Sequence, residues 1–204
     1  MPVLTIQGAG VTDCYLQAAS ATTNFNNDFV IGGQDTTDAT VRRALLKFVL
    51  TDIPAGSTIN SATLTLTVRI DRSANARTLS VYRVRRAWIE TEATWNVYST
   101  GNSWTTAGAA DTTNDREGTD VGTVTQPASP AVGSTLSITL TASKIQEMLT
   151  GGIFTNNGFL LQVATESDDA ILYDSTNVVT AADRPKLVVD YTPGGGSGTQ
   201  SKYW

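Results

Sequence analysis

The sequence predicts an all-β protein, an antiparallel sandwich of two sheets with one short helix. In residues 58–70 (TINSATLTLTVRI) apolar and polar residues alternate, which places Ala62, Leu64 and Leu66 on one face and threonines on the other. Only the segment around residues 143–150 shows apolar residues at helical spacing. Strands that follow one another without intervening helices form antiparallel sandwiches rather than parallel α/β sheets.

Strand candidates extend from the N-terminus to residue 191. They are residues 3–6, 13–17, 28–32, 42–50, 58–70, 78–86, 134–140, 157–165, 170–175 and 184–191. Between two of them, Pro and Gly in residues 52–59 (DIPAGSTI) predict a turn that Ile53 and Ile59 anchor to the core. Residues 107–120 are polar and without periodicity, which predicts a long surface loop.

The predicted helix covers residues 143–150. Its apolar side chains in KIQEML recur at i, i+3 and i+4. Ser143 and Gln146 have the spacing of a capping pair, and Gly151 is placed to end the helix. We expect it to lie between two strands.

The chain of 204 residues divides into a sandwich domain, residues 1–191, and a Gly-rich arm, residues 192–204. The arm ends in Tyr203 and Trp204. Ordering such a glycine-rich segment costs about 1–2 kcal/mol per residue, so it needs an anchor. We expect these two aromatic side chains to bind a neighbouring subunit or a supporting shell, which predicts a homo-oligomer.

Composition excludes several classes of function. The net charge is −5 and the pI is near 4.6, which argues against nucleic-acid binding because phosphates require a basic surface. The chain has no histidine, so it lacks the residue that Ser-His-Asp catalysis and histidine metal sites require. The one cysteine, Cys14, has no partner for a disulfide, and its alternating neighbours predict a partly buried, inert thiol.

The lack of a recognisable targeting signal predicts a product made in the cytosol. The N-terminal residues lack the basic and apolar regions of a secretion signal, and the chain starts with its own Met. No stretch approaches the roughly 18 apolar residues of a membrane span, so no membrane partner is expected.

Calcium is the metal that the sequence could best accommodate. Carboxylate and amide oxygens gather in three loops, at Asn24, Asn26, Asn27 and Asp28, at Asp35 and Asp38, and at Asp168 and Asp169. None of these loops has the spacing of a known calcium loop, and such residues are ordinary in turns. No cofactor is therefore predicted, and structural calcium remains the less favoured alternative.

Residues 85–104 (RRAWIETEATWNVYSTGNSW) allow three interpretations. Glu90 and Glu92 could form the carboxylate pair of a glycosidase, exposed indoles could stack on sugar rings, or the run could be a buried corner. No feature indicates a raised pKa or a substrate cleft, so we expect no enzyme activity. Because the run directly follows a strand, Trp88, Glu90 and Trp95 are predicted to be structural, with the glutamate capping backbone amides. If the protein binds a glycan, the stacking candidates are Trp104 and Tyr98, followed by Tyr82 and Tyr173.

An ordered set of short motifs resembles the DNRLRE domain family, which is grouped with carbohydrate-binding modules. The motifs are DCYL, NFNNDFVIGG, RRALLKFVLTDIPAGSTINSATLTLTV, LSVYRVRRAWIETEATWN, LTASKIQEMLTGG, NNGFLLQV and DSTNVVTAADRPKLVVDY. Together they cover about residues 11–191. The resemblance implies a noncatalytic jelly-roll sandwich, in which the W-x-E-x-x-x-T-W-N element of Trp88 to Asn96 belongs to the framework.

Two functions remain open on this resemblance. Jelly rolls of this type also serve as decoration or tail proteins on tailed bacteriophages, which are made in the host cytosol without a signal. The main hypothesis is therefore a noncatalytic structural protein of a virion, bound to a capsid or tail protein and to copies of itself. The alternative is a carbohydrate-binding module that recognises a polysaccharide outside the cell or on its surface.

Overall fold

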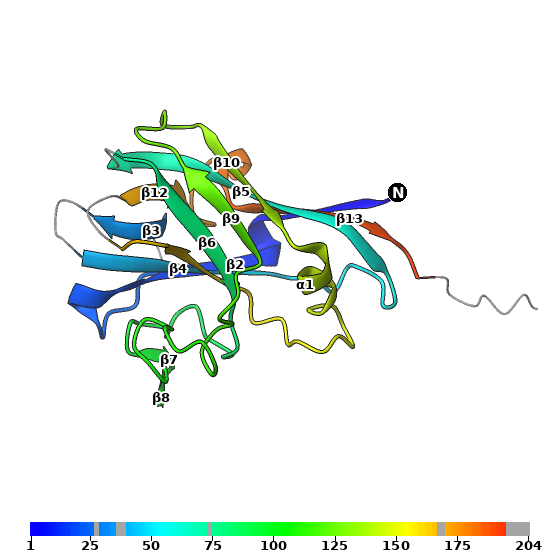
Figure 1. Cartoon of the computed structure of the whole chain (residues 1–204), viewed down its shortest axis with the longest axis horizontal. Helices are drawn as coiled ribbons and strands as arrows, with labels where there is room; N and C mark the ends of the chain where they lie inside the picture. Colours follow the sequence, from blue (N-terminus) through cyan, green and yellow to red (C-terminus); the bar gives the residue numbers. More distant parts are fainter. Residues whose placement is uncertain (27–28, 36–39, 73–74, 167–169, 195–204) are drawn as a thin grey trace, which may run out of the picture.

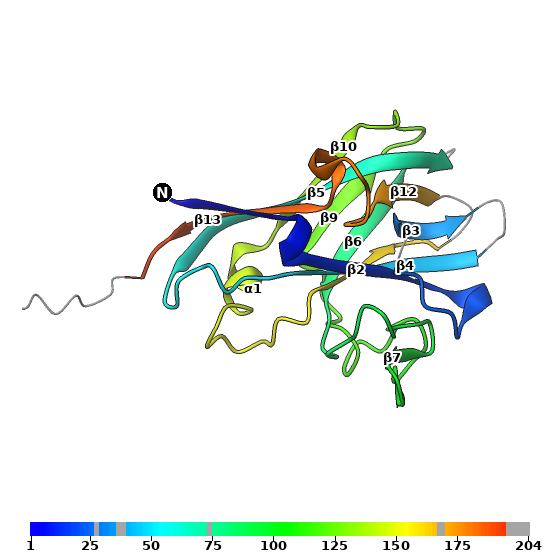
Figure 2. The same ribbon diagram turned by 180° about the vertical axis from the view of Figure 1, so that it is seen from behind.

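A computed structural model describes residues 1–26, 29–35, 40–72, 75–166 and 170–194 (Figures 1 and 2). The strands are β1 (Val3–Gln7), β2 (Val11–Gln17), β3 (Phe29–Asp35), β4 (Thr40–Phe48), β5 (Thr58–Arg72), β6 (Arg77–Arg83), β7 (Val97–Ser99), β8 (Asn102–Ser103), β9 (Gly122–Gln126), β10 (Thr135–Leu140), β11 (Phe159–Val163), β12 (Ala170–Asp174) and β13 (Lys186–Thr192). One α-helix, α1 (Ala142–Gln146), and three short 3₁₀ helices, η1 (Gly8–Gly10), η2 (Ala18–Ser20) and η3 (Ala181–Asp183), complete the described part.

These strands form an antiparallel β-sandwich, as the alternation predicts. The first sheet has the order β1–β13–β5–β10, and Figure 2 shows β1 and β13 side by side near the N-terminus. The second sheet has the order β12–β3–β4–β11–β6–β9, with β2 paired to β4. The long strand β5 joins the two sheets, because its first part pairs with β13 and β10 and its last residues pair with β12.

The main core lies between the two sheets. In β5 the residues Ala62, Leu64 and Leu66 are fully buried there, whereas Thr63 and Thr65 on the alternate face are half-buried and Thr67 is buried. The turn that precedes β5 buries Ile53 and Ile59 in the same core. Both predictions, the inward face of β5 and the anchored turn, are confirmed.

The helix differs from its prediction in length and in capping. Helix α1 ends at Gln146, a turn earlier than expected, and its N-cap residue Thr141 makes no side-chain cap hydrogen bond. The Gln146 side chain instead accepts from the Ile59 amide at 2.7 Å and donates to the Ser57 carbonyl at 2.7 Å. The predicted Ser143–Gln146 capping pair is wrong because Gln146 satisfies the backbone at the start of β5.

Three strands were missing from the sequence-based expectation. Strand β9 and the small hairpin of β7 and β8 lie in the stretch between residues 87 and 133, where alternation is weak. The predicted surface loop at residues 107–120 is also partly internal. Ala109 and Asp115 within it are fully buried.

The second sheet is apolar on both of its faces. On one face Leu46 and Phe159 join the main core, and on the other Leu45, Cys14 and Leu160 lie in register on β4, β2 and β11. These three residues form an outer cluster with side chains of the segment 84–109. Figure 1 shows this green segment, with β7 and β8, beneath the sheet. The segment is therefore a cover, and we call it the outer cover.

Replacing Leu45 with alanine tests the two-sided burial. Leu45 and Leu46 are both 0% exposed but belong to different clusters. We expect Leu45→Ala to lower the free energy of unfolding by about 2–5 kcal/mol, as buried leucine deletions do, and Leu46→Ala to have an effect of the same size. Thr65→Ala on the outward face of β5 is the control and should cost little. Denaturant unfolding that gives Leu45→Ala the small effect of Thr65→Ala would contradict the proposed cover.

Candidate functional site

The tryptophan-rich segment forms a buried corner. Trp88 is 7% exposed and donates its indole N–H to the Asn157 carbonyl at 2.7 Å. Trp104 is 4% exposed and donates to the Thr94 carbonyl at 2.9 Å. Buried indoles with satisfied N–H groups are typical of packing. Both rings therefore hold the outer cover on the sheet.

The two glutamates of the corner accept backbone hydrogen bonds. Glu90 accepts from the Asp13 amide of β2 at 2.9 Å, and Glu92 accepts from the Thr100 amide at 2.7 Å. Asn24 donates to the Glu90 and Ala93 carbonyls at 2.8 and 2.7 Å. Both carboxylates thus satisfy backbone amides at the corner.

A buried arginine fastens the far part of the cover. Arg43 on β4 makes a bidentate ion pair with Glu166, at 2.7 and 2.8 Å, and donates to the Gly108 carbonyl at 2.6 Å. Its guanidinium lies 5.0 Å from the centre of the Trp95 ring, which is half-buried. Trp95 is thus a wall of the cover beside Arg43.

The predicted sugar-stacking residues do not form an open platform. Trp104 is buried, and Tyr98 packs against it with ring centres 5.5 Å apart. Tyr173 faces the main core at 1% exposure, and Arg116 covers the Tyr82 ring at 3.9 Å. Among the residues whose side chains the structure describes, every tryptophan, tyrosine and phenylalanine is buried or half-buried. The stacking role predicted for Trp104 is wrong because that residue is part of the packed corner.

The predicted arm contacts and most of the calcium loops lie outside the described residues. This holds for Tyr203, Trp204, Asn27, Asp28, Asp38, Asp168 and Asp169. Of the described members, Asn24 uses its amide as a donor to the corner. In the part of the chain that was searched, no three His, Cys, Asp or Glu side chains cluster as metal ligands would.

The surface feature best suited to a ligand is the segment that follows α1. Residues 150–156, which we call the ridge, run in yellow below α1 in Figure 1 and have hollows on both sides. The Arg85 hollow, of about 190 Å³, is lined by Arg85, Ile153, Phe154, Thr155 and Asn157. The Thr51 hollow, of about 290 Å³, is lined by ridge residues, Asn156 among them, together with Leu50 and Thr51. The Gly56 hollow, of about 350 Å³, is lined by ridge residues together with Gly56, Gln146 and Glu147.

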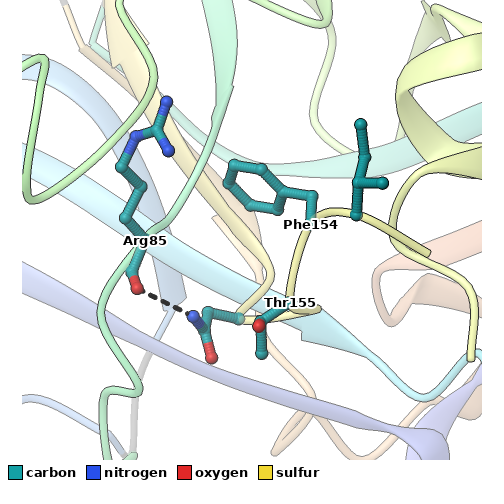
Figure 3. A pocket seen from close by; sticks show the side chains of 5 residues that line it. Arg85, Phe154 and Thr155 are labelled. Carbon is teal, nitrogen blue, oxygen red and sulfur yellow. Dashed lines mark hydrogen bonds between the residues drawn. The ribbon is translucent and has the colours of Figure 1, made fainter. Parts of the chain in front are cut away.

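Figure 3 shows the Arg85 hollow at close range. The Arg85 side chain and the Phe154 ring stand on opposite sides, with the guanidinium 5.3 Å from the ring centre. Asn157 donates to the Arg85 carbonyl at 2.9 Å and so joins the two walls. Thr155 and Ile153 are exposed at the rim. The hollow thus combines a guanidinium, a hydroxyl and apolar surface.

A second buried arginine holds the ridge in place. Arg83, at the end of β6, is 1% exposed and donates to both oxygens of Glu117 at 2.7 and 2.8 Å. It also pairs with Glu147 at 2.7 Å, and its guanidinium lies 3.9 Å from the centre of the Phe154 ring. Hydrogen bonds from Arg83 lower the pKa of Glu117, so that carboxylate is ionised at neutral pH.

Backbone and amide contacts fix both ends of the ridge. The Phe154 amide donates to the Glu147 carbonyl at 2.9 Å, which turns the chain back on α1. Asn156 donates to the Phe48 carbonyl of β4 at 2.8 Å. Gly151 has φ +81°, a conformation that favours glycine, and at Gly152 a Cβ would lie 2.2 Å from the Glu147 carbonyl oxygen. The ridge is therefore shaped by its glycines and held on the sandwich.

Most charges around the ridge already have partners. Arg85 lies 3.8 Å from Glu117, Lys144 lies 3.4 Å from the same carboxylate, and Glu147 pairs with Arg83. No sequence pattern predicts this site, because the residues that build it come from 50–56, 83–85, 117 and 144–157. One of the motifs that carry the family resemblance, LTASKIQEMLTGG, includes part of it.

The structure therefore defines a β-sandwich with open, shallow hollows around one surface loop. Comparison with known families adds the class of protein. Carbohydrate-binding module family 96 matches residues 5–150, most of the chain, and the protein belongs to this family. The match includes Arg83, Arg85 and α1 and ends where the ridge begins. No curated protein matches the chain. None of the helices in the described ranges is long and apolar enough to cross a membrane.

Arg83→Met tests how the ridge is held. The substitution removes the Arg83 guanidinium from Glu117 and Glu147, and breaking a buried ion pair costs about 3–5 kcal/mol. Adding Glu117→Leu to Arg83→Met should recover part of this loss, because it removes a carboxylate that has lost its shortest ion pair. Urea unfolding of both variants measures the effect. A loss below about 1 kcal/mol for Arg83→Met would show that the pair does not hold the ridge.

A second prediction concerns Asp13, which is 2% exposed beneath the corner. Burial raises its pKa to about 6, against the opposing hydrogen bonds from the Thr176 amide and hydroxyl at 2.8 and 2.9 Å. Because the folded pKa exceeds the unfolded value of about 3.9, Asp13 stabilises the fold below pH 4 and loses this contribution as the pH rises to 6. The difference corresponds to about 3 kcal/mol.

Unfolding of the wild type and Asp13→Asn at pH 4.5 and pH 7 isolates this effect. Other groups titrate alike in both proteins. Acidification should therefore raise the free energy of unfolding of the wild type relative to that of the variant. Equal pH dependence in the two proteins would mean that Asp13 ionises without cost.

Proposed function

We propose that this protein is a noncatalytic module that binds a polysaccharide at the ridge. Membership of carbohydrate-binding module family 96 is the observation that carries the proposal. The ridge supports it as the location, because three hollows adjoin one preformed segment there. Preformed sites avoid the entropic cost of ordering loops on binding.

Recognition at the ridge relies on hydrogen bonds and small apolar contacts. Arg85 presents guanidinium N–H groups and Thr155 a hydroxyl, which suit the hydroxyl and ring oxygens of sugars. Ile153, 89% exposed, and the Phe154 ring edge offer apolar surface to the C–H faces of a sugar. Such a site works without the exposed aromatic platform that the described residues lack.

We infer the absence of enzyme activity from how the carboxylates are used. Glycosidases need two carboxyl groups about 5–10 Å apart that face each other across a substrate cleft. Glu90 and Glu92 accept backbone hydrogen bonds within the corner, and Glu147 pairs with Arg83 beside the ridge. We infer that none of them performs acid–base chemistry on a bound sugar.

The hypothesis of a virion protein gains no support from the fold or the family. Its anchors, Tyr203 and Trp204, lie outside the described residues. Self-association and attachment to a capsid or tail stay predictions that depend on the arm. The family favours the alternative, a module that binds a polysaccharide. A location at a cell surface or outside the cell stays a prediction.

Arg85→Ala tests the proposed site. The side chain is 40% exposed and its ion pair is long, so the variant should fold normally. We expect its affinity for a polysaccharide selected from a panel of neutral and uronate polymers to fall about tenfold, as measured by affinity electrophoresis and calorimetry.

Arg69→Ala is the matched control. Arg69 on β5 is 42% exposed and lies 3.5 Å from Asp174, and it lines none of the three hollows. This control should bind like the wild type. Binding that is equally strong in Arg85→Ala would exclude the ridge, and no binding to any polymer of the panel would count against the function itself.

A further inference from the structure

We infer that the ridge binds an interior segment of a polysaccharide chain rather than a chain end. The inference rests on the proposed function and specifies its ligand. It follows from the arrangement of the three hollows, from the exposure of the residues at their borders, and from the way the ridge is fixed.

The three hollows share lining residues around the ridge. The Arg85 and Thr51 hollows share Phe154 and Thr155, and the Arg85 and Gly56 hollows share Ile153. The Thr51 and Gly56 hollows share the stretch 149–152. A polymer long enough to reach past these shared residues can therefore contact more than one hollow. Together they extend over the surface from β6 to the turn before β5.

The residues that border the hollows are exposed. Thr51, Gly56, Thr150, Ile153 and Thr155 are all exposed, and they lie at the two sides and along the crest. A site for a chain end requires a blocking wall that stops the polymer and contacts the terminal sugar. Because these five border residues are exposed, none of them forms such a buried end wall, and a polymer can enter and leave past them.

The ridge is also held too firmly to close over a terminal sugar. Phe154 is bonded to Glu147 through its backbone and stacked on Arg83, and Asn156 is bonded to β4. Gly152 lies against the Glu147 carbonyl oxygen, where a Cβ would not fit. The site therefore keeps its open form, and affinity must come from contacts spread along several sugar units.

Binding of oligosaccharides of graded length to the full chain tests the inference. The probes are di-, tetra- and hexasaccharides of the polymer selected in the panel, each also in a form reduced at one end and in a form capped at the other. We expect affinity to rise at least about tenfold from the di- to the hexasaccharide and to change less than about twofold on modifying either end.

Substitutions along the ridge give a second measurement. Thr51→Lys places a long side chain in the Thr51 hollow at an exposed position, and it should abolish the gain between tetra- and hexasaccharide while disaccharide binding persists. Thr180→Lys is the matched control, because Thr180 is exposed and lines none of the three hollows. Ile153→Ala should weaken hexasaccharide binding, and Val179→Ala, 95% exposed, should not.

The outcomes separate the inference from the function. If one end modification abolishes binding, the site binds chain ends and the inference is wrong. The same conclusion follows if cutting the polymer into shorter chains makes an equal mass of it a stronger inhibitor of binding. A length-independent affinity would also overturn it, since one hollow would then suffice. If no saccharide or polymer binds at all, the proposed function fails first.

Discussion

The structure depends on a sheet that is apolar on both faces. Leu45 and Leu46, neighbours on β4, point to opposite sides, and each is completely buried. A sandwich of two sheets can bury only the inner face of each, so the outer face of β2, β4 and β11 needs a cover of its own. The segment from β6 to β9 supplies it, and the buried indoles of Trp88 and Trp104 are its main apolar components.

Two buried arginines link this cover and the ridge to the sandwich. Arg43 joins β4 to the cover through Gly108 and the Trp95 ring, and its charge is paired with Glu166. Arg83 joins β6 to α1 and to Phe154. Buried charges are costly unless they are paired and hydrogen-bonded, and both arginines meet this condition. The same contacts that satisfy Arg83 give the candidate binding surface its fixed shape.

The buried corner and the candidate binding surface are therefore neighbouring parts of the molecule, and Arg85, at the start of the run 85–104, belongs to the second. Aromatic residues near carboxylates in a sequence suggest a sugar site, yet here the corner uses both kinds of side chain for packing and capping. The ridge has little aromatic surface and few unpaired charges, so no sequence pattern indicates a binding site there. Its contact with the corner is direct, since Trp88 donates to the Asn157 carbonyl at the end of the ridge.

By itself, the sequence determined the β-sandwich, most strand positions and the buried turn at Ile53 and Ile59, because alternation and turn residues are local signals. It did not determine the length of α1, the role of Gln146 or the burial of Trp104. Only the tertiary structure decided these, since each depends on a partner distant in sequence. The ridge is the clearest case. Arg83, Glu117, Glu147 and Phe154 have no sequence spacing in common, and folding alone brings them to one guanidinium.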